Sequence, residues 1–417
     1  MRTLFRHRDA RLYILGQTLS SVGDNALWLA MGIWVKILTG SNSAAGLVFF
    51  AFAAGALLAP ATGVLADRVR RRPLLAVTNL VGAALVCALL AVHGRGQVWL
   101  IYVVLFGYGV VNALLTSAQT AFVPALVPDD LLAAANALLQ VGSFGLRIFT
   151  PLLGAGMLAA IGAAPVVLLD AATFVAAAAC VLALRIREPR PERARSHWRA
   201  EAMAGVRYVA RTPVLRRLLV TFVLALSVVG FLETIGFAVV AQGLHRTPPF
   251  LGVLISVQGA GVIAGAVASP AILKGIGEVR AIAAALALVG IGSALLTISA
   301  IPAVVIGMLL FGGALALANI AIVTLIQRRT PSDLIGRVDS ALTVATTVPQ
   351  VLSIAVGAAL IAVVGYRTLL LVITAVMAVC IAYLLAGRDD QQHAAMAAQP
   401  GLPADLAVTD AAGADQS

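Results

Sequence analysis

The stretch GVLADRVRRRP, residues 63–73, separates two long apolar runs with one aspartate and four arginines. The apolar runs on either side cover residues 44–66 and 73–92. A helix of about 20 apolar residues is long enough to cross the hydrocarbon layer of a membrane, which is about 30 Å thick. We therefore expect two transmembrane helices joined by a short basic loop at the membrane surface.

The same alternation of apolar runs and polar loops continues along the chain. Of the 417 residues, 61% are hydrophobic and 11% are charged, and the mean hydropathy is +1.00. These values lie well outside the range of soluble domains. The fold class we expect is an all-α membrane protein with twelve transmembrane helices. They are placed near residues 12–38, 44–66, 73–92, 98–122, 131–158, 164–184, 214–243, 250–273, 279–299, 302–325, 339–364 and 366–386.

The net charge of +11 is explained by the way the basic residues are distributed. Of the 29 lysines and arginines, 24 fall in alternate loops and the two terminal segments, four fall in the opposite loops, and Arg147 lies within a span. By the positive-inside rule, both termini are expected to be cytoplasmic. We expect a multi-pass protein of the cell inner (plasma) membrane, with the lipid bilayer as its surroundings and no nucleic acid as a partner.

An internal repeat divides the spans into two sets of six. VPDDLLAAANALL (127–139) and TPSDLIGRVDSAL (330–342) align at an offset of 203 residues, and the register continues to Gly154 and Gly357. Two related six-helix bundles are a transporter architecture, with the binding site between them near the membrane midplane. The expected parts are a cytoplasmic N-terminus (1–11), a first bundle (12–184), a cytoplasmic linker (185–213) containing a surface helix, a second bundle (214–387) and a disordered cytoplasmic tail (388–417).

Polar residues recur at helical spacing inside several spans. Stripes of this kind are unfavourable against lipid, so they are expected to face a cavity for substrate. The alternative is that they form hydrogen bonds between packed helices. The candidate cavity residues are Gln17, Asn25, Trp28, Asn112, Thr116, Gln119, Asn136, Gln140, Ser143, Thr343, Thr346 and Gln350.

Three charged residues, Asp24, Arg147 and Glu233, lie deep within spans, and Asp170 lies nearer the outer end of the sixth span. A charge at the centre of a span costs about 2.5–3.5 kcal/mol on insertion scales, so each needs a partner or a function. We expect Arg147 to neutralise Asp24 or Glu233 across the cavity. A carboxylate whose pairing changes between conformations can bind and release a proton, which makes the three candidates for proton coupling. The alternative is a static ion pair that fixes helix packing.

The stretch at residues 63–73 resembles the signature of the major facilitator superfamily, Gly-x-Leu-Ala-Asp-Arg-x-Gly-Arg-Arg or Lys. The matching residues are Gly63, Leu65, Ala66, Asp67, Arg68, Arg71 and Arg72, whereas Arg70 stands where the family has its second glycine. Together with the twelve spans, the resemblance covers residues 10–387 and implies the major facilitator fold. It also implies a cytoplasmic gate formed by Gly63, Asp67, Arg68 and Arg71, with Asp130 as the candidate carboxylate partner.

Within that superfamily, SVGDNALWLA, VPDDLLAAANAL, RIFTPLLGAGM and LLDAATF are similar to the drug:proton antiporter branch, which contains bacterial macrolide effluxers and siderophore exporters. Two features depart from that branch: Thr150 precedes Pro151 where the antiporter motif has glycine, and the fourth span lacks an arginine. The resemblance implies an efflux antiporter of the multidrug-resistance kind, which exchanges protons for amphipathic small molecules by alternating access. The alternatives are an uptake or lipid-moving carrier of the same fold and a non-transporting membrane receptor or assembly factor.

The sequence contains no signature of an enzyme or of a bound cofactor. No glycine-rich phosphate loop with a lysine is present, which argues against a nucleotide-driven pump. The five histidines are far apart, so no metal site is expected. We expect a monomeric protein that is not an enzyme and has no cofactor, whose partners are a small-molecule substrate, protons and the bilayer.

Overall fold

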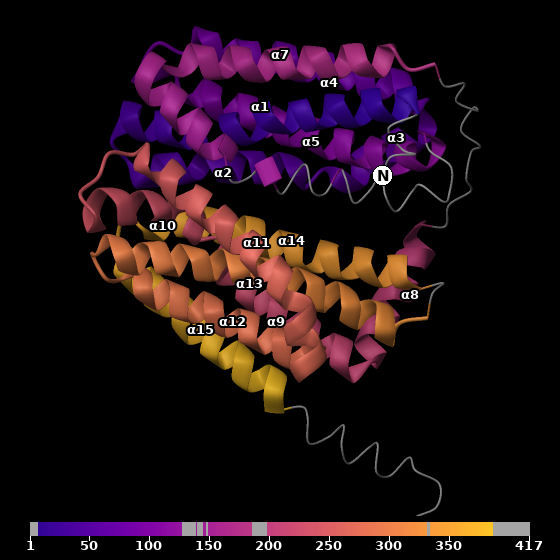
Figure 1. Cartoon of the computed structure of the whole chain (residues 1–417), viewed down its shortest axis with the longest axis vertical. Coiled ribbons are helices and arrows are strands. Elements are labelled where there is room, and N and C mark those ends of the chain that lie inside the picture. The colour runs from indigo at the N-terminus through magenta and orange to yellow at the C-terminus, as the bar shows by residue number, and fades with distance from the viewer. Residues whose placement is uncertain are drawn as a thin grey trace, which may run out of the picture.

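The computed structural model describes residues 7–126, 139, 145–146, 149–185, 198–331 and 334–386. Every regular element within these ranges is a helix. The helices form two lobes that lie side by side, with α1 to α7 in one and α9 to α15 in the other (Figure 1). The first lobe contains α1 (Arg8–Thr39), α2 (Asn42–Ala56), α3 (Ala59–Arg68), α4 (Arg71–Cys87), η2 (Ala88–Ala91), η3 (Arg95–Gln97), α5 (Val98–Leu126), the helix Phe149–Ile161 and α7 (Ala163–Leu182).

The second lobe follows a helix of the connecting segment, α8 (Trp198–Arg211). Its elements are α9 (Pro213–Val229), α10 (Leu232–Ala238), the π-helix η4 (Val239–Gly243), α11 (Phe250–Ile276), α12 (Glu278–Leu296), α13 (Ile301–Arg329), α14 (Ile335–Leu360) and α15 (Tyr366–Ala386). A helix is therefore present within 185–213 as α8, which packs against α9 and α14.

The prediction of an all-helical membrane protein is confirmed. Within the described residues, nine helices are long and apolar enough to cross a membrane, or ten when α2 and α3 are taken as one bent span. The first predicted span lies within the 32-residue α1, which is not one of these nine or ten helices. The last part of the fifth predicted span coincides with the helix Phe149–Ile161, whereas most of its earlier part lies outside the described residues.

The second span is bent where the sequence had suggested one continuous helix. Its two parts, α2 and α3, meet at an angle of 41°. Pro60 lies in the first turn of α3. A proline has no N–H to donate, and its ring collides with the carbonyl four residues earlier, here that of Ala56. Because α2 ends at Ala56, the bend has a local cause.

The internal repeat is visible in the helix bounds and in the packing. Both α5 and α13 are 29 residues long, and their first and last residues are 203 positions apart. The same offset relates the first residues of α7 and α15. In the first lobe α7 packs against α1 and α4, and in the second lobe α15 packs against α9 and α12. The two lobes are therefore built on one plan.

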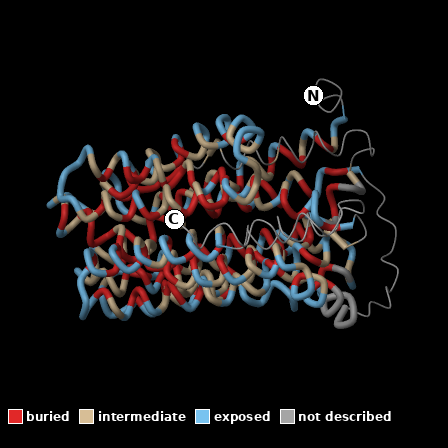
Figure 2. The backbone as a smooth tube through the Cα atoms, turned by 90° about the horizontal axis from the view of Figure 1, so that it is seen from below, coloured by how far each residue is buried: buried red, intermediate tan, exposed pale blue. Residues whose placement is uncertain are grey.

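Many exposed side chains on the helices are large and apolar, as the surroundings of a membrane protein require. They include Trp99 at 61% exposed, Val267 at 77% and Val379 at 61%. Along most helices, buried and exposed stretches alternate as each helix turns (Figure 2). Lipid tails are as apolar as these side chains, so the exposed residues fit a hydrocarbon solvent.

The two lobes meet tightly at one end of the molecule. A Cβ built at Gly46 of α2 would lie 2.8 Å from Thr234 Cγ2 of α10, and closer still to the Thr234 hydroxyl. At Gly32 of α1, a Cβ would lie 2.8 Å from the Phe237 ring. The rings of Phe49 and Phe237 stack across the lobes with centroids 6.0 Å apart. Small residues thus allow the lobes to close at this end.

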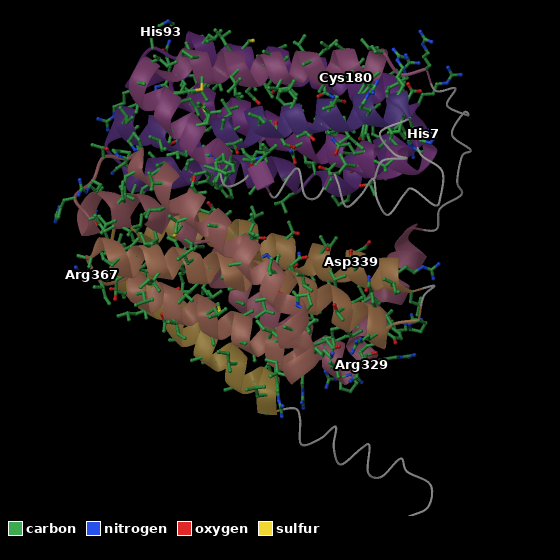
Figure 3. All side chains as sticks on the ribbon, in the orientation of Figure 1. His7, His93, Cys180, Arg329, Asp339 and Arg367 are labelled. Atoms are coloured by element: carbon green, nitrogen blue, oxygen red, sulfur yellow. The ribbon has the colours of Figure 1, made fainter. Side chains whose placement is uncertain are left out.

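The loops expected on one side of the membrane lie at one end of the molecule. His93 and Arg367, both in loops expected to face outward, lie at the end where the ribbons of the lobes come together (Figure 3). His7, Arg329 and Asp339 lie at the opposite end, toward which the ribbons diverge. The lobes therefore make their close contacts at the end opposite to the basic loops.

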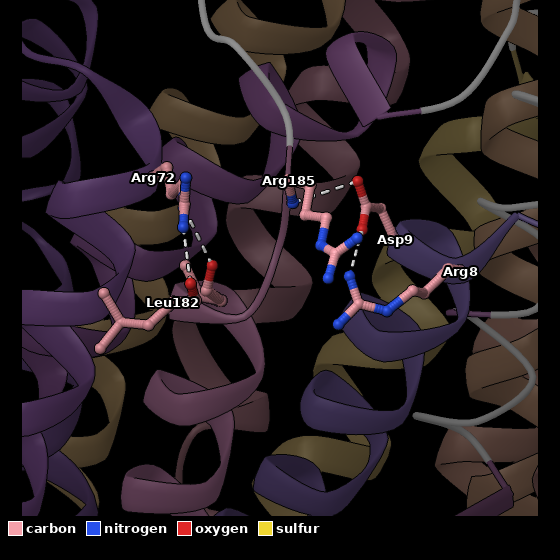
Figure 4. A network of polar contacts seen from close by, with 6 residues as sticks. Arg8, Asp9, Arg72, Leu182 and Arg185 are labelled. Carbon is pink, nitrogen blue, oxygen red and sulfur yellow. Dashed lines mark hydrogen bonds and ion pairs between the residues drawn. The ribbon is translucent and has the colours of Figure 1, made fainter.

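At the basic end, α4 is tied to the last turn of α7. Arg72 donates from Nε to the Val181 carbonyl at 3.2 Å and from a terminal nitrogen to the Leu182 carbonyl at 2.5 Å (Figure 4). The carbonyls of a last helical turn lack partners within the helix, and they carry the negative end of the helix dipole. Close by, the backbone N–H of Arg185 donates to the Asp9 carboxylate (Oδ2) at 3.2 Å. Arg72, which belongs to the basic stretch at 63–73, therefore caps α7.

Substituting Gly46→Val should open the end of the molecule where the lobes meet. The valine would overlap Thr234 across the lobes, which should destabilise the closed arrangement by about 1–3 kcal/mol. Spin labels at His93→Cys and Val363→Cys, with Cys87, Cys180 and Cys380 replaced, would report the distance between the lobes at this end. We expect a longer and broader distance distribution in the valine variant.

The matched control is Gly96→Val, at a position where an added Cβ meets no atom within 4 Å. It should leave the distribution unchanged. If Gly46→Val also left it unchanged, the contact between Gly46 and Thr234 would not hold the lobes together.

Replacing Arg72 with alanine should weaken the junction between α4 and α7. Two hydrogen bonds to the end of α7 are lost, and because the side chain is partly exposed we expect a cost of about 1 kcal/mol. The measurement is a lower thermal unfolding midpoint in detergent. Arg70→Ala removes an exposed neighbouring arginine and serves as the control. Equal midpoints for the two variants would contradict the capping role.

Candidate functional site

Three polar side chains meet inside the first lobe, where α1, α5 and α7 come together. The Tyr108 hydroxyl of α5 donates to Oδ1 of Asp24 on α1, and the Ser20 hydroxyl donates to Oδ2 of Asp24 at 3.5 Å. Asp170 of α7 is 0% exposed. Its carboxyl lies beside the same Tyr108 hydroxyl, although neither of its oxygens makes a hydrogen bond of normal geometry. The result is a cluster of two carboxyl groups and one phenol.

Glycines on one face of α1 make this meeting possible. A Cβ built at Gly23 would lie 2.9 Å from the Asp170 Cα and would overlap the carboxyl of Asp170 and the hydroxyl of Thr173. Two turns earlier, a Cβ at Gly16 would lie 2.9 Å from Cys180 Cβ. Membrane helices often approach closely through small residues of this kind. Gly23 therefore sets the distance between α1 and α7 at the level of Asp170.

The polar stripes predicted on α1 and α5 face each other in part. Gln119 Nε2 donates to Gln17 Oε1 at 3.0 Å, which links the two helices. Asn25 instead donates to the Ser21 carbonyl of its own helix at 2.7 Å. On α5, Asn112 is half-buried and Thr116 is exposed. Of the predicted residues here, Asp24, Gln17 and Gln119 bond across the helix interface.

Trp28 and Glu233 lie near the end where the lobes meet. The ring of Trp28 packs against Phe49, with centroids 4.6 Å apart, and Phe49 in turn stacks on Phe237 of the other lobe. Glu233 lies in the first turn of α10, is half-buried, and precedes Thr234, which touches Gly46. Asp24 and Glu233 therefore belong to different lobes, and Asp24 makes its described hydrogen bonds inside its own lobe.

The predicted residues of α14 are less buried. Thr346 is half-buried and donates to the Leu342 carbonyl at 2.8 Å, whereas Thr343 and Gln350 are exposed. Several other candidates lie outside the described residues, so their predicted roles stay predictions. They are Asp130, Asn136, Gln140, Ser143 and Arg147.

The residues predicted to form a cytoplasmic gate flank the junction of α3 and α4. Gly63 lies on α3, where an added Cβ would be 3.9 Å from Ser117 of α5. Arg68 ends α3 and is exposed, and Arg71 begins α4 and is half-buried. Asp67 lies on α3, and its side chain is outside the described part of the structure. The gate therefore stays a prediction.

An open apolar hollow of about 620 Å³ lies between α1 and the helix Phe149–Ile161. The hollow is shallow, and the exposed apolar side chains of Phe149, Leu152 and Leu153 along it also fit contact with lipid tails. The described residues that line it are Val22, Leu146, Phe149, Thr150, Leu152, Leu153, Gly156 and Met157. No group of three histidine, cysteine or acidic side chains that could hold a metal occurs among the residues with described positions.

Sequence reasoning missed Tyr108 and Gly23 and did not include Asp170 among the candidates. Tyr108 is one aromatic residue in an apolar run, and Gly23 is one of 38 glycines. The available signal was Asp170 itself, because a carboxyl group within a span needs a partner. That partner comes from a helix distant in sequence, and no spacing rule could identify it.

The family of the chain follows from comparison with known proteins. A family model described as Major Facilitator Superfamily matches residues 13–353. The chain belongs to the major facilitator superfamily. This confirms the resemblance at residues 63–73, and it makes the chain a multi-pass membrane transporter of small molecules by family.

Individual relatives agree with this membership. The chain is 25% identical over 392 residues to "Uncharacterized MFS-type transporter YfiS" of Bacillus subtilis (strain 168), covering 86% of this chain and 88% of that protein. The structure resembles the nucleoside transporter NupG with a TM-score of 0.72, at 12% identity, over 91% of this chain and 98% of that one. It resembles a bacterial homologue of the iron transporter ferroportin in its inward-facing state with a TM-score of 0.68, at 16% identity, over 91% and 98%. At such identities the structures show a shared major facilitator fold.

Within this major facilitator protein, Gly23→Ala should disturb the cluster directly. The added methyl group would meet backbone and side-chain atoms of Asp170, so α1 and α7 must move apart at a cost of about 1–3 kcal/mol. We expect a lower thermal unfolding midpoint in detergent. Gly156→Ala adds the same methyl where nothing lies within 4 Å. Equal midpoints for the two variants would contradict the close packing at Gly23.

Proposed function

We propose that this transporter exports amphipathic small molecules in exchange for protons, alternating between inward-open and outward-open states. The observation that carries the proposal is the carboxyl group of Asp24. It lies in α1, the helix of the first predicted span, and receives hydrogen bonds from Tyr108 and Ser20. None of the cationic side chains in the described ranges forms an ion pair with it.

A carboxyl group in such a position is suited to exchanging protons. An ionised carboxylate in hydrocarbon surroundings is costly without a cation, whereas the protonated form is neutral. Water reaching the group in one conformation would favour ionisation, and exclusion of water in the other would favour protonation. One proton moving down a potential of 100 mV supplies about 2.3 kcal/mol, which is the energy source the proposal requires.

The arrangement of the lobes supports alternating access. They make tight contacts through Gly46 and Thr234 and through Phe49 and Phe237 at one end, whereas the ribbons diverge toward the other end (Figure 1). With the basic end cytoplasmic, as the positive-inside rule predicts, this arrangement corresponds to a state that is closed outward. Rocking of one bundle against the other would open the opposite end.

The substrate class and direction rest on two further points. The hollow beside α1 is almost entirely apolar, which suits the greasy part of an amphipathic molecule. The direction of transport, export and not uptake, is argued from the sequence, because residues 127–138 and several further residues before Phe149 are outside the described ranges. Four segments are similar to the drug:proton antiporter branch, and that resemblance favours export.

The test is dye accumulation driven by a pH gradient in inside-out vesicles that contain the purified transporter. Wild-type protein should accumulate an amphipathic dye and lose the accumulation when a protonophore is added. We expect Asp24→Asn and Glu233→Gln each to reduce this pH-driven uptake strongly, because an amide side chain cannot ionise and so cannot bind and release a proton as a carboxyl group does. Glu278→Gln is the control, since Glu278 lies in the first turn of α12 and already has a cation, the exposed Arg328, at 2.7 Å.

If both the Asp24 and the Glu233 variants transported at the wild-type rate, proton coupling through these residues would be contradicted.

A second experiment, accumulation of antibiotics and dyes in deletion and overexpressing cells, decides between export and uptake. Export predicts lower, protonophore-sensitive accumulation on overexpression. An uptake or lipid-moving carrier predicts the reverse for its cargo, and a receptor or assembly factor predicts no change.

A further inference from the structure

We infer that Asp170, Tyr108 and Asp24 form a buried proton-binding site within the first lobe, in which Asp170 holds the proton and Tyr108 relays it to Asp24. The inference deepens the proposed function and rests on it for its role in transport. It concerns two residues, Asp170 and Tyr108, that face the interior of one lobe and do not line the space between the lobes.

The first argument is the surroundings of Asp170. The residue is 0% exposed, and neither carboxyl oxygen has a hydrogen-bond partner of normal geometry. An ionised carboxylate without hydrogen bonds or a nearby cation is highly unfavourable away from water, whereas a neutral carboxylic acid is tolerated. The second carboxyl, that of Asp24, shares the Tyr108 hydroxyl and would repel an ionised Asp170. Both effects favour a proton on Asp170 in this conformation.

Among the residues that the structure describes, the groups that face this site do not supply a positive charge. Among the described helices, α1, α4 and η2 pack against α7, and α5 also touches it where the Tyr108 ring meets Phe174 with centroids 5.7 Å apart. From these elements, only Asp24 and Tyr108 reach the carboxyl of Asp170 among the described titratable groups. The two arginines of α4 lie at its first turn, where Arg72 caps α7 at Val181. That carbonyl is 11 residues, or about 16 Å, from Asp170 along the helix.

The remaining titratable side chains of these helices have other neighbours. Tyr13 packs against Phe122, and Cys180 contacts Gly16. Tyr102 and Lys36 donate to backbone carbonyls, those of Ala44 and Gly40, and Cys87 is exposed. The charged residues of the first turn of α1 lie far along that helix from Asp24; they are Arg8, Asp9 and Arg11. The cluster is therefore an acidic site inside an apolar lobe.

The second argument is the internal repeat, because the second lobe has the same scaffold without the acidic cluster. At the offset of 203 that relates α5 to α13 and α7 to α15, Tyr108 corresponds to Phe311 and Asp170 to Ile373. Both counterparts are buried, at 6% and 0% exposed. The helices α9, α13 and α15 contain no acidic residue. Asp24 corresponds to Ser227, whose hydroxyl donates to the Val223 carbonyl of its own helix. These helices thus pack without an acidic side chain, so the cluster of the first lobe is not a requirement of the fold.

The relay transfers one proton and leaves the tyrosine neutral. The O–H bond of the Asp170 carboxylic acid breaks as its proton moves to the Tyr108 oxygen. The O–H bond of Tyr108 breaks in the same step as its own proton moves to Asp24 Oδ1, to which the hydroxyl already donates. Asp24 ends protonated and Asp170 ionised, and the reverse step restores the first state.

The test is infrared spectroscopy of the whole transporter in lipid vesicles, because a protonated carboxylic acid has its own carbonyl stretching band. In wild-type protein at neutral pH we expect such a band, and we expect its loss in Asp170→Asn. Tyr108→Phe should shift the band, because a neighbouring hydroxyl is removed. Glu278→Gln should leave it unchanged, because Glu278 is paired with Arg328 in the other lobe.

Asp170→Ile provides a second variant, since isoleucine stands at the matching place of the second lobe. It should fold, as judged by a monodisperse profile in detergent, and it should also lack the band. The inference is overturned if wild-type protein has no band at neutral pH, or if the band remains at full size in both Asp170 variants.

Transport measured in the same vesicles separates this inference from the proposed function. A band that depends on Asp170, together with dye transport that a protonophore does not affect, would overturn proton-coupled transport and leave the site standing. If transport is protonophore-sensitive but the carbonyl band is the same in wild-type protein and in the Asp170 variants, the proton-binding site is overturned and proton-coupled transport stands.

Discussion

The close approach of α1 to α7 at Gly23 determines where the polar groups of the first lobe meet. Consecutive residues of a helix project about 100° apart. Because Gly23 faces Asp170 on α7, Asp24 is turned toward Tyr108 on α5. Neither lipid tails nor apolar neighbours can hydrogen-bond these groups, so they must be satisfied by one another or be neutral. A residue without a side chain thereby brings two carboxyl groups and a phenol together.

The comparison of the two lobes separates what the fold needs from what this protein adds. The helices α5 and α13 have equal length, and Tyr108 and Phe311 are both buried at the same place. A duplicated scaffold can carry different residues at equivalent positions once packing is satisfied, and function is then located where the copies differ. The acidic cluster of the first lobe is such a difference.

The sequence was sufficient for the architecture and for part of the site. The length of the apolar runs predicted the spans, because the hydrocarbon thickness of the membrane sets that length. The offset of 203 predicted the repeat, because duplication leaves matching residues at a fixed separation. Spacing also indicated Gln17 and Gln119, which bond to each other. It could not indicate Tyr108 as the partner of Asp24, because in an apolar helix no periodic signal tells which side chain meets a distant one. The bend before Pro60 was available from local chemistry, yet membrane helices often tolerate proline without a break.

A single helix connects the acidic cluster to the contact between the lobes. α1 runs without interruption from Arg8 to Thr39, with Asp24 at the cluster and Gly32 against Phe237 of the other lobe. These two residues are eight positions apart, which is about 12 Å along the axis. An intact helix transmits a displacement over that distance, since its backbone hydrogen bonds resist local stretching. If α1 shifts within the first lobe as the lobes separate at Gly32, Asp24 moves relative to Tyr108 of α5, and a change of proton at Asp24 acts back on the same contact. On the proposed mechanism, α1 is the element through which proton binding and lobe movement are coupled.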